Sequence, residues 1–95
     1  MLSKIPINIE GMRQKDIEKV ILRTAIIAEL DAISLYEEMA SLVQDEKIKK
    51  VLLDVAKEEK THVGEFLALL NLKDEEQEQE LREGEKEVRE ILGEL

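Results

Sequence analysis

The residues best suited to chemistry in this sequence are Glu29, Glu59 and His62. Glu59 and His62 are three positions apart, so on a helix both side chains lie on the same side, about one turn from each other. Glu29 and Glu59 both fall on helix faces that are otherwise apolar, because their neighbours one turn away, apart from His62, are alanine, isoleucine and valine. A carboxylate buried without a partner costs several kcal/mol, so each glutamate requires a compensating charge.

The two glutamates are expected to meet. Glu29 lies 16 residues before Asp45 and Glu59 lies 14 residues after it, and each helical residue rises about 1.5 Å. In an antiparallel hairpin that turns at Asp45, the two carboxylates reach the same height to within about 3 Å. Two like charges at one level repel, and a cation between them removes the conflict. The pattern therefore predicts a metal site made by Glu29, Glu59 and His62.

Other interpretations of these residues stay open at this point. A buried glutamate can instead be protonated, or paired with an arginine or lysine from elsewhere. A single histidine beside an apolar face is often an ordinary core residue, and a Glu-x-x-His pair alone arises by chance in acidic helices. The alternative from another functional class is a non-enzymatic helical interaction module, in which Glu29 and Glu59 contact a basic partner.

The elements that must position these side chains are long helices. The one proline is Pro6, and only Gly64 interrupts the stretch from Asp16 to Leu70. We predict an all-α protein with a single domain over residues 1–95, divided into an N-terminal arm over 1–11 and helices over 12–43, 46–70 and 74–95. Asp45 and Asp74 are expected to cap the second and third helices. So short a connection between the first two helices forces an antiparallel hairpin.

The third helix differs from the first two in composition. Residues 71–95 contain ten acidic and four basic residues, yet an apolar stripe recurs at helical spacing. The stripe consists of Leu81, Val88, Ile91, Leu92 and Leu95. Two interpretations stay open, a helix that docks on its own hairpin and an arm that packs on another subunit.

Composition excludes several classes of protein. The chain has 95 residues, no cysteine and a formal net charge of −9, with aromatic residues at 2%. Thiolate metal sites and disulfides are therefore excluded, and a phosphate-binding surface would normally carry the opposite charge. No apolar run exceeds five residues, which is far too short for a membrane span, and no signal peptide is expected, so a cytoplasmic location is predicted.

Two segments carry a resemblance to a known family. Residues 28–36, Ala-Glu-Leu-Asp-Ala-Ile-Ser-Leu-Tyr, and residues 56–62, Ala-Lys-Glu-Glu-Lys-Thr-His, resemble the ferritin-like di-iron carboxylate superfamily. A complete site in that superfamily takes a glutamate from each of two helices and a Glu-x-x-His pair from each of two others. This chain holds half of that set, so it resembles the half-length encapsulated ferritins. The resemblance implies a homodimer in which two hairpins form one ferritin-like four-helix bundle.

The resemblance also implies an activity and a setting. It implies a ferroxidase that oxidises Fe(II) to Fe(III) with O₂ or peroxide, at a site holding two iron ions per dimer, where Mn or Zn can substitute. It implies dimers joined into a ring, typically a decamer, held as cargo in a cytoplasmic encapsulin nanocompartment that stores the iron. A rubrerythrin-like, peroxide-reducing di-iron protein is the alternative on the same site.

The same resemblance assigns roles to residues. Glu29, Glu59 and His62 correspond to the iron ligands, and Tyr36 to a tyrosine just outside them. Asp31 matches one position of an acidic site on the first helix at which metal enters, while Ala28 and Leu35 stand where relatives have an acid and an aromatic residue. The sequence ends in its helical pattern, without the docking peptide of cargo members, so fusion to a shell also stays open.

Overall fold

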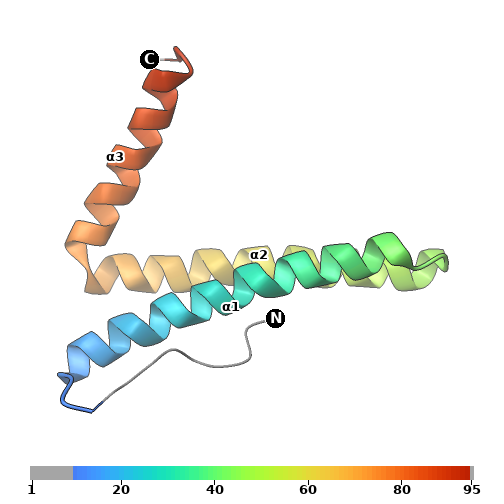
Figure 1. Ribbon diagram of the computed structural model, residues 1–95, viewed down its shortest axis with the longest axis horizontal. Helices are drawn as coiled ribbons and strands as arrows, with labels where there is room; N and C mark the ends of the chain where they lie inside the picture. The colour runs from blue at the N-terminus through green and yellow to red at the C-terminus, as the bar shows by residue number, and fades with distance from the viewer. Residues whose placement is uncertain (1–9, 95) are drawn as a thin grey trace.

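The computed structural model describes residues 10–94 and contains three α-helices, α1 (Gln14–Leu42), α2 (Glu46–Lys73) and α3 (Glu75–Ile91). α1 and α2 run antiparallel as a long hairpin, and α3 projects from the far end of α2 (Figure 1). The prediction of an all-α chain with a hairpin and a short C-terminal helix is confirmed. Most of the predicted arm, residues 1–9, lies outside the described residues.

The helix ends differ in part from those predicted. α2 continues to Lys73, three residues past the predicted end at Leu70, because no glycine or proline stops it before Asp74. α1 begins at Gln14 and ends at Leu42, slightly inside the predicted range of 12–43. α3 ends at Ile91 rather than at residue 95, since Gly93 adopts a left-handed φ of 73° and its N–H donates back to the Glu90 carbonyl at 3.1 Å.

Both predicted helix caps are present. The Asp45 carboxylate accepts hydrogen bonds from the backbone N–H groups of Lys47 and Ile48, at 2.8 and 3.1 Å. The Asp74 carboxylate accepts one from the backbone N–H of Gln77 at 3.0 Å. Its other oxygen accepts a hydrogen bond from the Arg23 guanidinium at 2.7 Å, which ties the start of α3 to α1. Asp74 therefore stabilises the α2–α3 junction in two ways, as the N-cap of α3 and as the ion-pair partner of Arg23.

Replacing Asp74 with alanine should lower the free energy of unfolding by about 1–2 kcal/mol, because an N-cap is lost together with the partner of Arg23. Denaturant unfolding followed by circular dichroism measures this change. Asp74→Asn is the matched control, since asparagine caps as well as aspartate but carries no charge for Arg23, and an exposed ion pair contributes little. An Asp74→Ala protein as stable as the unsubstituted protein would contradict the capping role.

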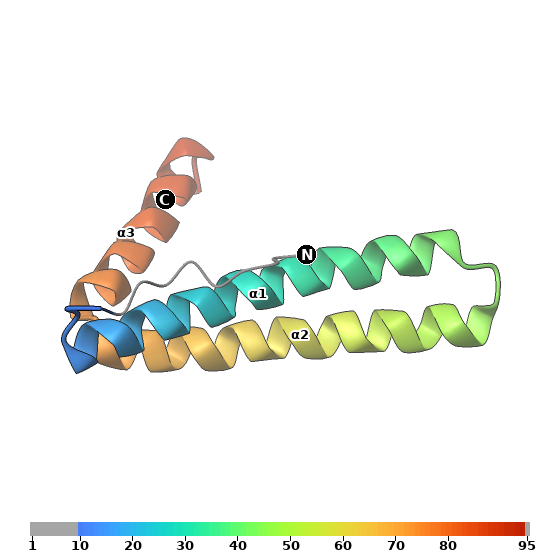
Figure 2. The same ribbon diagram turned by 60° about the horizontal axis from the view of Figure 1, so that its bottom comes forward.

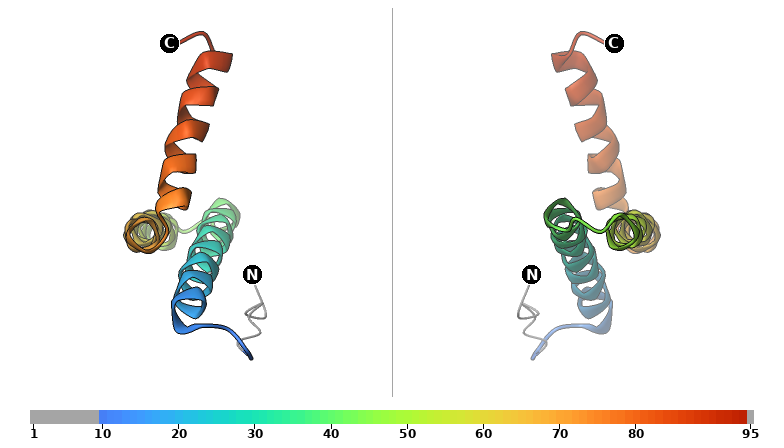
Figure 3. Two further views of the ribbon diagram at one scale, coloured as in Figure 1. Left: turned by 90° about the vertical axis from the view of Figure 1, so that its left-hand side faces the viewer. Right: turned by 90° about the vertical axis from the view of Figure 1, so that its right-hand side faces the viewer.

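The hairpin buries few large side chains. Within residues 10–94, the buried apolar residues are Ala32, Ala40, Ala56 and Leu70. Views from the side and along the hairpin show why, because, of the helices described, α1 packs only against α2, α3 meets only the end of α2, and each helix keeps most of its circumference free (Figures 2 and 3). Burial of apolar surface is the main stabilising term in folding, so a core this thin indicates that one hairpin is an incomplete folding unit.

α3 does not dock on its own hairpin. Among the described helices it packs only against α2, and it points away from α1 (Figures 1 and 3). The stripe residues that the structure describes, Leu81, Val88, Ile91 and Leu92, are all exposed, and Leu95 lies outside the described residues. The first of the two interpretations of this helix is therefore wrong for a single chain. No helix described between residues 10 and 94 has the length and apolar character needed to cross a membrane.

Candidate metal centre

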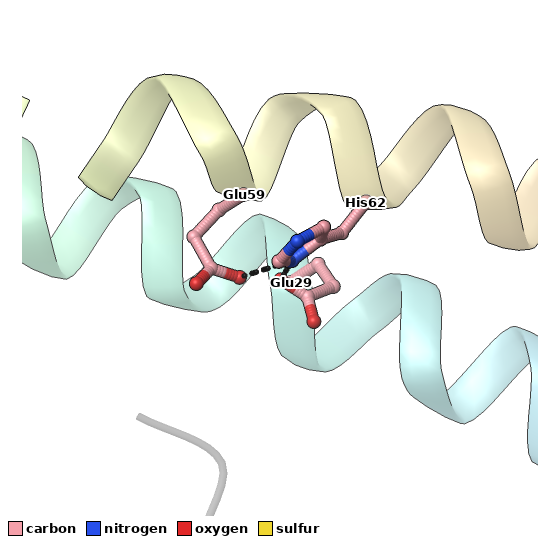
Figure 4. A group of neighbouring side chains, drawn as sticks. All are labelled: Glu29, Glu59 and His62. Carbon is pink, nitrogen blue, oxygen red and sulfur yellow. Dashed lines mark ion pairs between the residues drawn. The ribbon is translucent and has the colours of Figure 1, made fainter. Parts of the chain in front are cut away.

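The structure brings Glu29, Glu59 and His62 together at the middle of the hairpin. Each offers one ligand atom, and these atoms all lie within 4.8 Å of one another. The His62 Nδ1 atom is 3.5 Å from Glu29 Oε2 and 3.4 Å from Glu59 Oε2. Glu29 reaches the group from α1, while Glu59 and His62 reach it from α2 (Figure 4). The spacing argument from the sequence is thus realised, since two positions on opposite arms of the hairpin share one height.

Two buried alanines lie one helical turn from the carboxylates. Ala32 follows Glu29 on α1 by three residues, and Ala56 precedes Glu59 on α2 by three. The distance between packed helices depends on the side chains at their contact, so alanine on both sides allows close approach. We infer that these alanines set the spacing at which the two carboxylates converge. In the sequence they are only apolar neighbours of the two glutamates. Their role in setting the distance between the helices is inferred from their burial.

The group places two carboxylates in a shielded position without a hydrogen-bond partner for one of their oxygens. Glu29 and Glu59 are largely shielded, with side chains 20% and 19% exposed, while the His62 side chain is 42% exposed. Glu29 Oε2 is buried and forms no hydrogen bond, and its 3.5 Å separation from His62 Nδ1 is too long for a good one. Buried polar atoms in folded proteins are nearly always satisfied, so an unpartnered carboxylate oxygen calls for a missing partner.

No base of the described chain supplies that partner. Among residues 10–94, neither Glu29 nor Glu59 forms an ion pair with a lysine or arginine. Lys60, which follows Glu59 directly, instead pairs with Glu37 across the hairpin at 3.1 Å. The interpretation in which a distant lysine or arginine neutralises these glutamates is therefore wrong within the described chain.

The donor set fits a transition metal. Two carboxylates and one imidazole suit iron, manganese and zinc, and carboxylate oxygen favours iron over zinc. Three ligands from one chain leave coordination positions free, and the exposure of His62 shows that one side of the group is open. The arrangement can therefore hold a divalent cation between two negative charges and leave room for a second metal or an oxidant.

Two further residues from the sequence prediction lie outside this group. Tyr36 is half-buried on α1, seven residues or about 10 Å along the helix from Glu29. Asp31 is half-buried on a different side of α1 and is not a member of the cluster. The role of Tyr36 beside the ligands and that of Asp31 at the metal's path into the site stay predictions.

Comparisons with known proteins agree with this geometry. The sequence profile of a family described as rubrerythrin matches residues 20–94. A "Ferritin-like-encapsulin shell fusion protein" from Pyrococcus furiosus is 63% identical over 73 residues, which are 77% of this chain but 21% of that protein. The chain thus corresponds to about a fifth of that relative's length.

A solved structure is similar over nearly the whole chain. It is described as the crystal structure of the encapsulated ferritin domain from Pyrococcus furiosus, with 53% sequence identity and a TM-score of 0.83. The match covers 98% of this chain and 95% of that one. With a hairpin that gathers a Glu-x-x-His pair and a facing glutamate, and with a profile match over most of its length, the chain belongs to the rubrerythrin family of ferritin-like proteins as an encapsulated ferritin domain.

Proposed function

We propose that two copies of this chain form a ferroxidase that takes Fe(II) as its substrate and oxidises it to Fe(III). The observation that carries the proposal is the cluster of Glu29, Glu59 and His62, with a buried carboxylate oxygen that has no hydrogen-bond partner. A cation is the partner that satisfies this oxygen and relieves the repulsion between the two carboxylates. The family is a di-iron family, which makes Fe(II) the first candidate for that cation.

A second copy of the chain completes the site in this proposal. One hairpin supplies one glutamate and one Glu-x-x-His pair, and a twofold axis duplicates every ligand, which gives four glutamates and two histidines for two iron ions. The open side of the cluster at His62 and the thin core of the hairpin support the same conclusion. Pairing two hairpins also covers apolar side chains that one chain leaves exposed.

Glu29, Glu59 and His62 have complementary roles in the proposed oxidation of Fe(II). Glu29 and Glu59 place negative charge against the substrate, which stabilises Fe(III) more than Fe(II) and therefore favours loss of an electron. His62 adds a neutral nitrogen donor, which limits the negative charge of the site. Each Fe(II) gives one electron, so a pair reduces O₂ to hydrogen peroxide with two protons, or hydrogen peroxide to water. The net charge of −9 raises the local concentration of Fe(II) around the protein.

The proposed setting is an encapsulin shell in the cytoplasm. Support comes from the relative from Pyrococcus furiosus, whose name joins a ferritin-like part and a shell part in one chain. In this proposal the dimers assemble further into a ring, typically a decamer, and pass ferric iron to the shell for storage.

Metal content and turnover test the proposal together. Protein loaded with Fe(II) without oxygen and then desalted should retain about one iron per chain, measured by plasma mass spectrometry. Admitting O₂ should convert the bound Fe(II) to Fe(III), followed by ferric absorbance. A protein that retains no iron would overturn the proposal and favour the non-enzymatic interaction module.

The choice of oxidant separates the ferroxidase from its closest alternative. The matched family profile is named for rubrerythrin, so hydrogen peroxide is the second oxidant to test. Rates with O₂ and with hydrogen peroxide should be compared at equal iron loading. Fast oxidation by peroxide together with negligible oxidation by O₂ would favour a peroxide-reducing protein. The cysteines of a rubredoxin-type electron donor would then have to come from outside these 95 residues, which contain none.

A further inference from the structure

The lysine that directly follows Glu59 is held by an acid outside the metal cluster. Lys60 lies on α2, and its ammonium is 3.1 Å from the Glu37 carboxylate of α1. Both side chains of this ion pair are exposed, 59% for Lys60 and 47% for Glu37. The pair thus crosses the surface of the hairpin, close to a cluster in which the Glu29 Oε2 atom is buried and has no hydrogen-bond partner.

The backbone of Lys60 lies at nearly the height of Glu29. Glu29 is 16 residues before Asp45 and Lys60 is 15 residues after it, so their backbones differ by about 1.5 Å along the hairpin. Glu37 is only 8 residues before Asp45, which places its backbone about 10 Å closer to the turn than that of Lys60. The Lys60 side chain therefore leans along the hairpin to reach Glu37, although the Glu29 carboxylate is nearly level with its own backbone.

Lys60 is thus the base best placed to compete with a metal ion for the cluster. Two converging carboxylates attract any cation, an ammonium included. The lysine ammonium is carried on a flexible four-carbon stem, so it can turn from one carboxylate to another nearby. Lys57 is less suited to this role, because it lies two positions before Glu59 and therefore points to nearly the opposite side of α2.

Two effects keep Lys60 out of the cluster. An ammonium drawn between the helices loses part of its hydration, which costs free energy. Glu37 offers it a partner at a place where both charged groups remain exposed to water. An exposed ion pair is weak, but the two positions of Lys60 exclude each other, so even a weak pair shifts the balance between them.

We propose that Glu37 is a positioning residue, which holds Lys60 away from Glu29 and Glu59 and so leaves these two carboxylates free for Fe(II). The inference rests on the proposed function, since it concerns what competes with the metal substrate of that site. Without Glu37, Lys60 turns to the carboxylates in a large fraction of metal-free molecules, and the metal must displace it. The apparent affinity for metal is then reduced to the fraction of molecules in which the cluster is free.

The ion pair lies apart from the surface on which a second hairpin is proposed to pair. Lys60 and His62 are two positions apart on α2, so they point to nearly opposite sides of the helix. Substitutions at Lys60 and Glu37 are therefore expected to leave the pairing of hairpins at His62 unchanged. Their effect on metal binding then reports on the cluster itself.

Mn(II) binding to the full-length chain, measured by calorimetry, tests the proposal. Glu37→Gln should raise the dissociation constant about tenfold, as it does when Lys60 occupies the cluster in about nine of ten metal-free molecules. Lys60→Gln should bind Mn(II) at least as tightly as the unsubstituted protein. Glu37→Gln combined with Lys60→Gln should restore the unsubstituted dissociation constant. Glu38→Gln is the matched control, because it removes the same charge from an exposed neighbouring position, and it should change the constant little.

The effect of Lys60→Gln separates this role from a merely structural one. If the ion pair only fixed the register of the two helices, Lys60→Gln would weaken Mn(II) binding as much as Glu37→Gln does, and the double variant would not recover. Either result would overturn the proposal. In Fe(II) oxidation, Glu37→Gln should raise KM about tenfold and leave kcat unchanged, because saturating metal displaces the lysine.

A crystal structure of metal-free Glu37→Gln protein tests the position of Lys60 without relying on metal. The Lys60 ammonium should lie within about 4 Å of a carboxylate oxygen of Glu29 or Glu59, the range of an ion pair. A Lys60 side chain that stays out of the cluster in this variant would overturn the inference and leave the ferroxidase untouched. Unsubstituted protein that binds neither Mn(II) nor Fe(II) would instead refute the proposed function, and the position of Lys60 in the variant would still decide whether Glu37 holds it away.

Discussion

Alanine at Glu59 or at His62 is expected to slow Fe(II) oxidation by about a hundredfold or more while the helices remain intact. Loss of a group that only supports a ligand typically costs 10–100-fold, so loss of a ligand should cost at least as much. The measurement is stopped-flow absorbance of ferric iron under matched loading. The structure makes the result specific to these positions, because both side chains converge on Glu29 within 4.8 Å.

Glu59→Ala should lower activity without lowering the stability of the metal-free protein. In the metal-free protein the carboxylates of Glu29 and Glu59 repel each other, so Glu59→Ala should leave the melting temperature unchanged or raise it. A gain of about 1 kcal/mol corresponds to roughly 4–8 °C for a domain of this size. A fall of that size would show that Glu59 stabilises the fold by itself.

Neighbouring positions provide the controls. Glu58 and Thr61 are both exposed on α2 and stand directly beside the two tested residues. Glu58→Ala removes the same charge as Glu59→Ala, and Thr61→Ala removes a polar side chain next to His62. Both variants should oxidise Fe(II) at the rate of the unsubstituted protein. Equal rates in Glu59→Ala or His62→Ala would remove that residue from the ligand set.

The cluster could be predicted from the sequence because the prediction needed only local helical periodicity and the position of one turn. Helical periodicity placed Glu29 and Glu59 on apolar faces, and Asp45 fixed where the hairpin reverses. Once the turn was known, equal distance along two antiparallel helices was enough to bring the side chains together. Long helices with a short connection leave few alternative registers, which is why the inference held.

The direction of α3 could not be predicted in this way. It depends on a contact between Arg23 and Asp74, which are 51 residues apart, and no local pattern marks Arg23 as a partner. The end of α2 was also misjudged, because residues 71–73 continue a helix as readily as they end one, and only the cap at Asp74 decides. The positioning role of Ala32 and Ala56 was hidden for a similar reason, since alanine suits a helix whether buried or exposed.

Metal should also strengthen dimerisation. If the ligands of each metal come from two chains, a metal ion binds the dimer and not the monomer, and mass action transfers its binding free energy to association. At a metal concentration 100 times the dissociation constant, this linkage contributes about 2.7 kcal/mol, or a hundredfold, for each site.

The linkage can be measured as a shift in the dimer dissociation constant. Sedimentation velocity on a dilution series, without metal and with Mn(II) or anaerobic Fe(II), should show at least a hundredfold tighter dimer when metal is present. His62→Ala should lose most of the shift, whereas Glu58→Ala should retain it. A monomer that binds metal tightly without associating would show that one hairpin is a complete site, and the open side of the cluster at His62 would then face solvent rather than a second chain.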